Sequence, residues 1–254
     1  MNAAPAGCFC GPPEAAADWQ RCWAAAWPAT EVLLLLAATD TAAVPGISAA
    51  GATPESRRRT AAADAELLER GPQSRPTHSL PPLPAGVTPA LISHVVLREL
   101  GIAPLVIDLG CPVAPAVPHL RLPEPAGAGP ARCLSGGRAM DPERVEALLA
   151  QGAAWGARPA AGSGAPLLIA ECVPGGTTTA QAVLTGLGLD VGGLVSGSLP
   201  RPAHALKADL VARGLGAAGL VRAPAEPHPS VDAARARRVL AALGDPMQPL
   251  AAGL

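Results

Sequence analysis

Aromatic and charged residues are scarce in this sequence. It has four Trp, one Phe and no Tyr among 254 residues. Proteins that bind single-stranded nucleic acid stack bases on aromatic rings, and this chain has few to offer. Charged residues make up only 15 %, and the net charge is −1. A nucleic-acid-binding protein needs a basic face to release the counterions of phosphates. The composition therefore argues against a nucleic-acid partner.

Long apolar runs and metal-binding patterns are also missing. The most apolar run, 32–38, has the length of a strand, whereas a membrane span needs ~18 to 20 residues. Residues 1–13 have no basic cluster followed by an apolar stretch, so no secretory signal is predicted. No C-x-x-C pair and no Cys/His pair with zinc spacing occurs. We therefore expect a cytoplasmic protein without a metal site or a membrane partner. Its six cysteines are predicted to be buried free thiols: Cys8, Cys10, Cys22, Cys111, Cys133 and Cys172.

Small and aliphatic residues dominate what is present. Apolar residues make up 49 %, and Gly and Pro contribute 28 and 30 residues. The core must therefore be built from Ala, Val, Leu and Ile, and the length suffices for one large α/β domain. Residues 1–30 are predicted to form a helical and irregular extension, because three tryptophans recur at helical spacing. Residues 31–254 are predicted to form the α/β domain.

Buried strands and helices alternate along that domain. Continuous apolar runs at 31–40, 104–109 and 165–171 predict central parallel strands that are buried on both faces. The region 110–130 is predicted to be a long loop. The alternation indicates an α/β fold with a mainly parallel sheet flanked by helices. Helices are predicted, from apolar spacing with Thr-Pro, Asp-Pro and Gly boundaries, at 54–69, 88–101, 142–155, 203–213 and 231–243. The region 175–188 is predicted to be a loop that runs into a helix.

The segment LLIAECVPGGTTTAQAVLTGL carries the strongest chemical signal. A strand ends at Glu171, a Gly-Gly turn follows, and three threonines begin a helix. The first amides of a helix lack partners and form the positive end of its dipole. We therefore expect the backbone amides of residues 173–179 to converge on an anion such as a phosphate. The predicted phosphate-binding residues are Gly175, Gly176, Thr177, Thr178 and Thr179.

A plain structural role is the alternative for this loop, with Thr177 as a helix cap and the glycines as a turn. The loop is not a Walker A motif, because no lysine follows its glycines. The patterns G-x-S-x-G and H-E-x-x-H are absent, which argues against a nucleophile elbow or a zincin. Glu171 could orient a hydroxyl, accept a proton or balance a positive charge.

Two further candidates lie elsewhere in the sequence. The segment DTAAVPGISAAG follows the first strand, and Asp40 and Ser48 could contact a ligand in a pocket of small residues. A simple turn is the alternative. Lys207 is the only lysine among 19 basic residues, and a compact ammonium suits a phosphate. A solvated surface position is its alternative. The consecutive residues Arg57, Arg58 and Arg59 are predicted to form a solvated helix face.

Several segments together resemble a known family. They are TDTAAVPGISAAGATPESRRRTAAADAE, PPLPAGVTPALIS, PAVPHLRL, AECVPGGTTTAQAVLTGLGLD and GDPMQ. The resemblance is to a branch, often described as uncharacterised, that is related to nicotinate-nucleotide–dimethylbenzimidazole phosphoribosyltransferase. It covers roughly Val32 to the end, and the ECVPGGTTTA and PGISAAGATPE segments are its most specific parts.

The resemblance implies a Rossmann-like α/β fold, a smaller second domain and a homodimer without a cofactor. The implied activity moves phosphoribose from nicotinate mononucleotide to 5,6-dimethylbenzimidazole and releases nicotinate. Glu171 would match the family's glutamate before the phosphate loop, and Gly175–Thr178 would match that loop. Asp40 and Ser48 would begin the pocket for the acceptor base. Lys207 would match a lysine on the phosphate side.

The family's chain continues well past the GDPMQ-like segment, whereas this sequence ends a few residues after it. That continuation holds further strands, a second glycine-rich element and the glutamate that serves as general base. We therefore expect a domain that is incomplete at its C-terminus. Three hypotheses follow: the family's transferase, a catalytically silent nucleotide-binding protein or partner subunit, and an unrelated phosphosugar enzyme.

Overall fold

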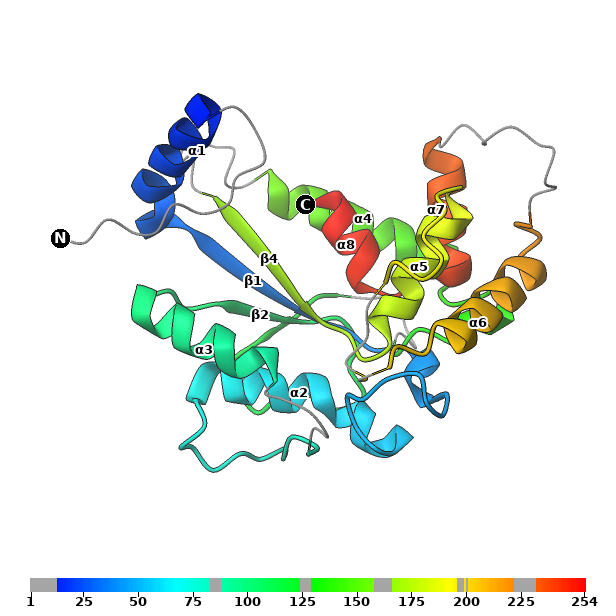
Figure 1. The fold of residues 1–254 in the computed structure, drawn as a ribbon, viewed down its shortest axis with the longest axis horizontal. Helices are drawn as coiled ribbons and strands as arrows, with labels where there is room; N and C mark the ends of the chain where they lie inside the picture. Colours follow the sequence, from blue (N-terminus) through cyan, green and yellow to red (C-terminus); the bar gives the residue numbers. More distant parts are fainter. Residues whose placement is uncertain are drawn as a thin grey trace.

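The computed structural model describes residues 13–82, 88–123, 129–157, 166–195, 199, 201–221 and 232–254. Its centre is a parallel sheet with strand order β3-β2-β1-β4 (Figure 1). The predicted α/β fold with a parallel sheet flanked by helices is confirmed. The strands are β1 (Glu31–Leu36), β2 (Leu105–Asp108), β3 (Leu120–Arg121) and β4 (Leu167–Cys172).

Two strand predictions need correction. β4 was expected to be buried on both faces, but it lies at the edge of the sheet, with Leu168 38 % and Ile169 43 % exposed. Neighbouring strand residues point to opposite faces, so β4 is open on both sides. The short strand β3 lies inside the region 110–130, where the sequence predicted only a loop. β1 and β2 are buried as expected, apart from the first residue of each.

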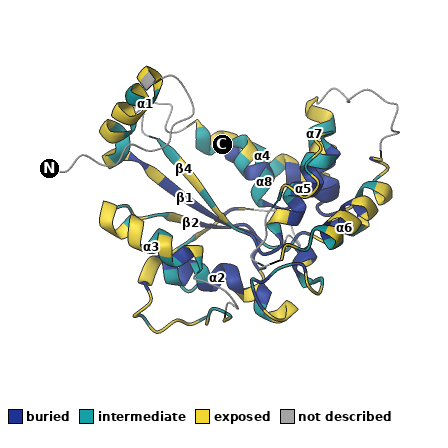
Figure 2. Ribbon diagram, in the orientation of Figure 1, coloured by how far each residue is buried: buried dark blue, intermediate teal, exposed yellow. Residues whose placement is uncertain are grey.

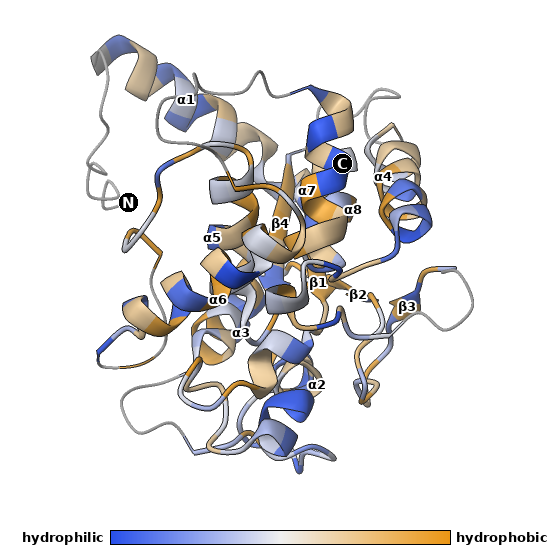
Figure 3. Cartoon of the chain, turned by 90° about the vertical axis from the view of Figure 1, so that its right-hand side faces the viewer, coloured by the Kyte–Doolittle hydropathy of each residue, from blue (hydrophilic) through white to orange (hydrophobic). Residues whose placement is uncertain are grey.

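Two helix pairs cover the two faces of the sheet (Figure 1). α2 carries many hydrophilic residues (Figure 3), yet it packs on β1 because Ala61, Ala65 and Leu68 form one apolar face. On the other face, Leu148 and Leu250 pack against Leu33 and Leu35. The first pair is α2 (Pro54–Arg70) with α3 (Pro89–Leu100), and the second is α4 (Pro142–Gly156) with α8 (Met247–Gly253).

The apolar face of α3 is exposed rather than buried (Figure 2). Thr88 caps this helix as predicted, and Gly101 ends it in the left-handed conformation. Apolar side chains on one face of a helix usually pack inward, but Ile92, Val95 and Val96 are 62 %, 51 % and 47 % exposed. The helical period shows that these side chains share one face of the helix, but it does not show what that face contacts.

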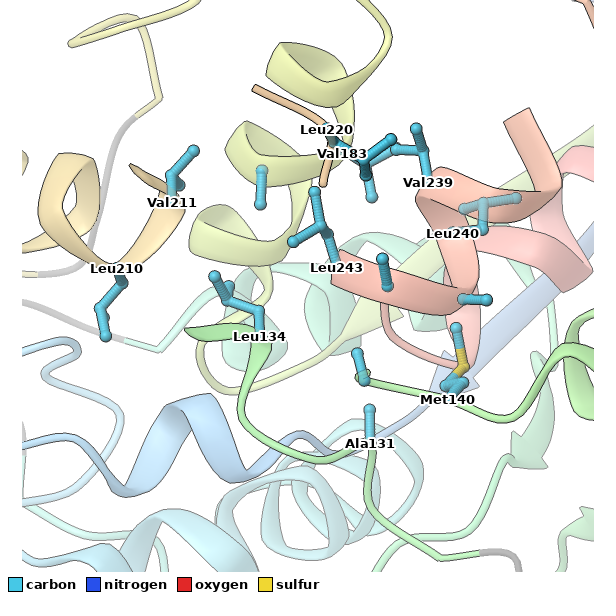
Figure 4. Close-up of a cluster of buried hydrophobic side chains, with 14 of the residues drawn as sticks. Ala131, Leu134, Met140, Val183, Leu210, Val211, Leu220, Val239, Leu240 and Leu243 are labelled. Carbon is cyan, nitrogen blue, oxygen red and sulfur yellow. The ribbon is translucent and has the colours of Figure 1, made fainter. Parts of the chain in front are cut away.

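A second core lies beyond the carboxyl ends of the strands. Figure 4 shows side chains from three helices and the turn η3 (Leu134–Gly136) gathered in one cluster. Leu210 and Leu243 are almost fully buried there. This cluster fixes the position of α6 against α5, which the site described below requires. The helices are α5 (Gly176–Gly186), α6 (His204–Ala217) and α7 (Ala233–Leu243).

The N-terminal tryptophans lie on one side of α1 (Pro13–Ala26) and the turn η1 (Trp27–Ala29), and each ring contacts the next in a tilted arrangement. This agrees with the predicted helix. Cys8 and Cys10 lie outside the described residues. The other four cysteines are free as predicted, but only Cys111 is buried: Cys133 and Cys172 are partly buried, and Cys22 is exposed. Within the described ranges, no helix is long and apolar enough to cross a bilayer.

Candidate functional site

The loop from β4 to α5 packs against the turn that follows β1. Gly175 has φ +85°, and a Cβ there would lie 3.1 Å from the backbone nitrogen of Ala42 in η2 (Asp40–Ala43). A side chain at this position would be strained and would also push the two loops apart. Gly175 therefore serves the contact between the two loops, and anion approach is not needed to explain it.

Most amides of this loop already have acceptors. Gly176 donates to the Val173 carbonyl at 2.7 Å, and the amides of Thr178 and Thr179 donate to the Gly175 carbonyl at 2.9 and 3.4 Å. The expectation that all amides of residues 173–179 converge on a ligand is therefore wrong. Within the described part of the chain, the amides of Gly175 and Thr177 donate to no other group. An anion at the start of α5 would have these two donors.

The three threonines are placed very differently. Thr177 is exposed at the first turn of α5, whereas Thr178 and Thr179 are fully buried. The Thr179 hydroxyl lies 2.6 Å from Asp245 Oδ2 and 2.8 Å from the Gly176 carbonyl. The hydroxyl of Thr178 is buried without a partner among the described residues. Only Thr177 presents its hydroxyl to a ligand.

Lys207 is brought to this threonine by the packing of α6 beside α5. Its Nζ donates to Thr177 Oγ1 at 2.8 Å, and the residue is only 1 % exposed. Because the Thr177 oxygen accepts from the ammonium, its own proton is available to an anion. Burial lowers the pKa of Lys207. The structure thus joins an ammonium, a hydroxyl and a helix N-terminus, and the alternative of a solvated surface lysine is excluded.

Two carboxyl groups, those of Glu171 and Asp245, lie next to the loop from β4 to α5. Partial burial and the nearby Asp245 raise the pKa of Glu171, while the Val173 amide lowers it. Burial raises the pKa of Asp245 to about 6, although bonds from Thr179 and from the Met247 and Gln248 amides oppose this shift. Asp245 lies in the GDPMQ segment, which sequence reasoning used for the resemblance without assigning it a role.

A cavity of about 860 Å³ opens in front of Glu171, between the sheet and the helices α2 and α3. Its size is within the range of small-molecule sites. Ser48 lies in its wall, where its oxygen accepts a bond from the Ala50 amide at 3.1 Å. The walls combine apolar side chains such as Val32 and Leu34 with Glu171, Gly176 and Thr177. One cavity thus unites Glu171, the start of α5 and an apolar compartment.

Arg57 holds the loop that carries Ser48. The sequence predicted a solvated arginine, but Arg57 is 4 % exposed and donates to the carbonyls of Gly51, Ala42 and Val44 at 2.8, 2.5 and 3.0 Å. These bonds tie together the two ends of segment 42–51. Arg57 therefore positions the cavity wall instead of facing water.

Asp40 lies apart from the other predicted site residues. It is exposed, its Oδ1 is 3.9 Å from Arg58 Nη2, and it lines a separate small recess behind Pro174. The structure therefore brings Ser48, Glu171, Gly175, Gly176 and Thr177 into one cavity, and Lys207 is bonded to Thr177 at its edge. Among the described residues, no group of three His, Cys, Asp or Glu side chains is arranged to hold a metal.

The chain is similar to two cyanobacterial UPF0284 proteins. It is 57 % identical to one from Parasynechococcus marenigrum over 88 % of this chain and 53 % of the relative. It is 53 % identical to another, from Prochlorococcus marinus, over 93 % of this chain and 55 % of the relative. The chain thus spans about half the length of the curated relatives it matches. No family model matches it.

Two solved structures from Thermus thermophilus have a similar architecture. The crystal structure of CobT superposes with a TM-score of 0.60 at 22 % identity, covering 96 % of this chain and 66 % of that one. The chain has the CobT fold. A nicotinate-nucleotide–dimethylbenzimidazole phosphoribosyltransferase from the same organism gives 0.55 at 22 % identity, over 88 % and 56 % of the two chains. At this identity, the CobT likeness describes the fold alone.

Proposed function

We propose that this chain binds nicotinate mononucleotide and provides the cavity in which phosphoribose is transferred to 5,6-dimethylbenzimidazole. The phosphate would bind at the start of α5, and the acceptor base would occupy the apolar compartment near Ser48. The observation that carries the proposal is the Lys207–Thr177 pair at the edge of a cavity that also contains Glu171. The names of the solved structures with this fold support the same chemistry.

The residues suit this reaction. The bond between the ribosyl carbon and the pyridine nitrogen breaks, and its electron pair neutralises the cationic ring of the leaving nicotinate. A benzimidazole nitrogen forms the new bond, and the N–H proton passes to a base. The protein must therefore supply a phosphate anchor, alignment of the two rings and a carboxylate. Glu171, whose pKa is raised, is our candidate for balancing charge or accepting the proton.

Calorimetric titration with nicotinate mononucleotide tests the nucleotide site. We expect Lys207→Met to weaken binding by about tenfold or more, because a charge-assisted bond to the phosphate is lost. Nicotinate riboside, which lacks the phosphate, should bind the variant and the parent chain equally. Arg213→Met is the matched control on the same helix, since Arg213 is exposed and pairs with Asp209. Undetectable heat with the parent chain at millimolar ligand would overturn the proposal.

A second function is a nucleotide-binding protein or partner subunit without turnover. Its test needs the acceptor base as well as the nucleotide, because nucleotide binding is common to both functions. Incubation with both substrates and detection of α-ribazole phosphate separates the two functions. A cytoplasmic homodimer without a cofactor remains part of the proposal, and sedimentation measures its mass.

A further inference from the structure

Asp64 faces the same cavity from α2 and has no role in the scheme above. Thr60, Asp64 and Leu68 recur at every fourth position of the helix, and all three line the cavity. The carboxyl group thus lies in a wall that is otherwise mostly aliphatic. Burial raises the pKa of Asp64, and its bonds to Thr88 and Cys172 partly oppose this shift.

Thr88 holds one oxygen of this carboxyl group. Its hydroxyl donates to Asp64 Oδ1 at 2.8 Å and accepts a bond from the Ala90 amide at 3.3 Å as the cap of α3. A hydroxyl has a single proton, and the Ala90 amide fixes its direction. The cap therefore also orients Asp64 across the gap between two helices.

Cys172 holds the other oxygen. Its Sγ lies 3.3 Å from Asp64 Oδ2, and both residues line the cavity. Burial and the adjacent Asp64 raise the pKa of the Cys172 thiol well above its usual value, so the sulfur keeps its proton and donates it. Asp64 is thus fixed from α3 and from the end of β4.

These two bonds leave accepting capacity on the carboxylate, which has about four lone-pair sites. A partly buried carboxylate in a mostly apolar wall favours a ligand that brings an N–H group to its remaining lone pairs, because a charge away from water is stabilised by each added hydrogen bond. We propose that Asp64 is the specificity-determining residue of the apolar compartment and accepts a hydrogen bond from the single ring N–H of the acceptor base, so that Glu171 keeps the charge-balancing role of the two offered above. The inference rests on the proposed function and names the group by which the base is recognised.

The test compares 5,6-dimethylbenzimidazole with its 1-methyl derivative, which lacks the N–H, by fluorescence titration of the 254-residue chain. We expect the parent chain to prefer the N–H base by about tenfold, because methylation removes the hydrogen bond from the base to Asp64. In Asp64→Leu, which has no acceptor, the ratio of the two dissociation constants should fall to about 1. Asp64→Asn should reduce it as well. Comparing ratios removes the steric effect of the methyl group.

Asp141→Asn is the matched control, since this exposed carboxylate pairs with Arg132 on the far side of the sheet. Nicotinate mononucleotide should bind every variant as it binds the parent chain, which shows that they are folded. An equal preference for the N–H base in parent and Asp64→Leu would overturn the role of Asp64. Absence of base binding by the parent would overturn it too. The nucleotide titration then decides separately whether the proposed function survives.

Discussion

On one face of the sheet, α4 and α8 touch through glycines, and a Cβ at Gly152 would lie 2.3 Å from the Leu250 carbonyl. On the other face, α2 and α3 leave the cavity of about 860 Å³, and Ile92, Val95 and Val96 are exposed at its border or beyond it. Both helix pairs flank the same two buried strands. Residue size at the helix contacts therefore decides which face of the sheet is closely packed and which face can admit a ligand.

The largest expected effect is on the packed face. Gly152→Ala should lower the free energy of unfolding by about 3 kcal/mol, because the backbones of α4 and α8 must separate. The matched control is Gly216→Ala in α6, where a Cβ meets no atom within 4 Å. That change should stabilise the protein by up to about 1 kcal/mol through helix propensity. Urea denaturation measures both, and equal effects would show that the helices are not in close contact.

The next effect concerns Asp245, which precedes α8. Its folded-state pKa of about 6 exceeds the usual value of 3.8, so the folded protein binds this proton more tightly than the unfolded chain. The stability of the parent, relative to Asp245→Asn, should therefore fall by about 2 to 3 kcal/mol as pH rises from about 4 to 6.5. Denaturant melts at several pH values measure the difference. Parallel pH profiles would contradict the raised pKa.

The smallest effect is expected on the open face. Val95→Ala in α3 should change the free energy of unfolding by less than about 0.5 kcal/mol, since Val95 is 51 % exposed. The same substitution at Val145 in α4, which is 1 % exposed, should cost about 2 kcal/mol. Thermal denaturation compares the pair. A similar cost at both positions would mean that the α3 face is covered in solution.

The sequence predicted elements whose signals are local. The Thr53-Pro54 and Thr88-Pro89 pairs mark the starts of α2 and α3, because capping depends on neighbouring residues. The exposure of α3 and the edge position of β4 could not be predicted this way. The helical or strand period shows which side chains share a face, but not what lies opposite that face.

The same distinction between local signals and tertiary contacts applies to the candidate site. The loop 171–179 and Lys207 were singled out from residue types and the resemblance, and the structure places them together. The burial of Arg57 was missed, because its carbonyl partners belong to a loop whose path is set by tertiary structure. Asp64 was missed too, since Cys172 lies 108 residues further along the chain. The Thr88-Pro89 cap was the only local hint of that cluster.

The single lysine of the sequence is almost fully buried at Thr177. Amine-selective reagents therefore have one side-chain target, and it lies inside the proposed phosphate anchor. Slow acetylation of this ε-amine would follow how often α6 moves away from α5, and a bound phosphate would slow it further. The rate at which Lys207 reacts therefore reports whether the proposed phosphate site is closed or occupied.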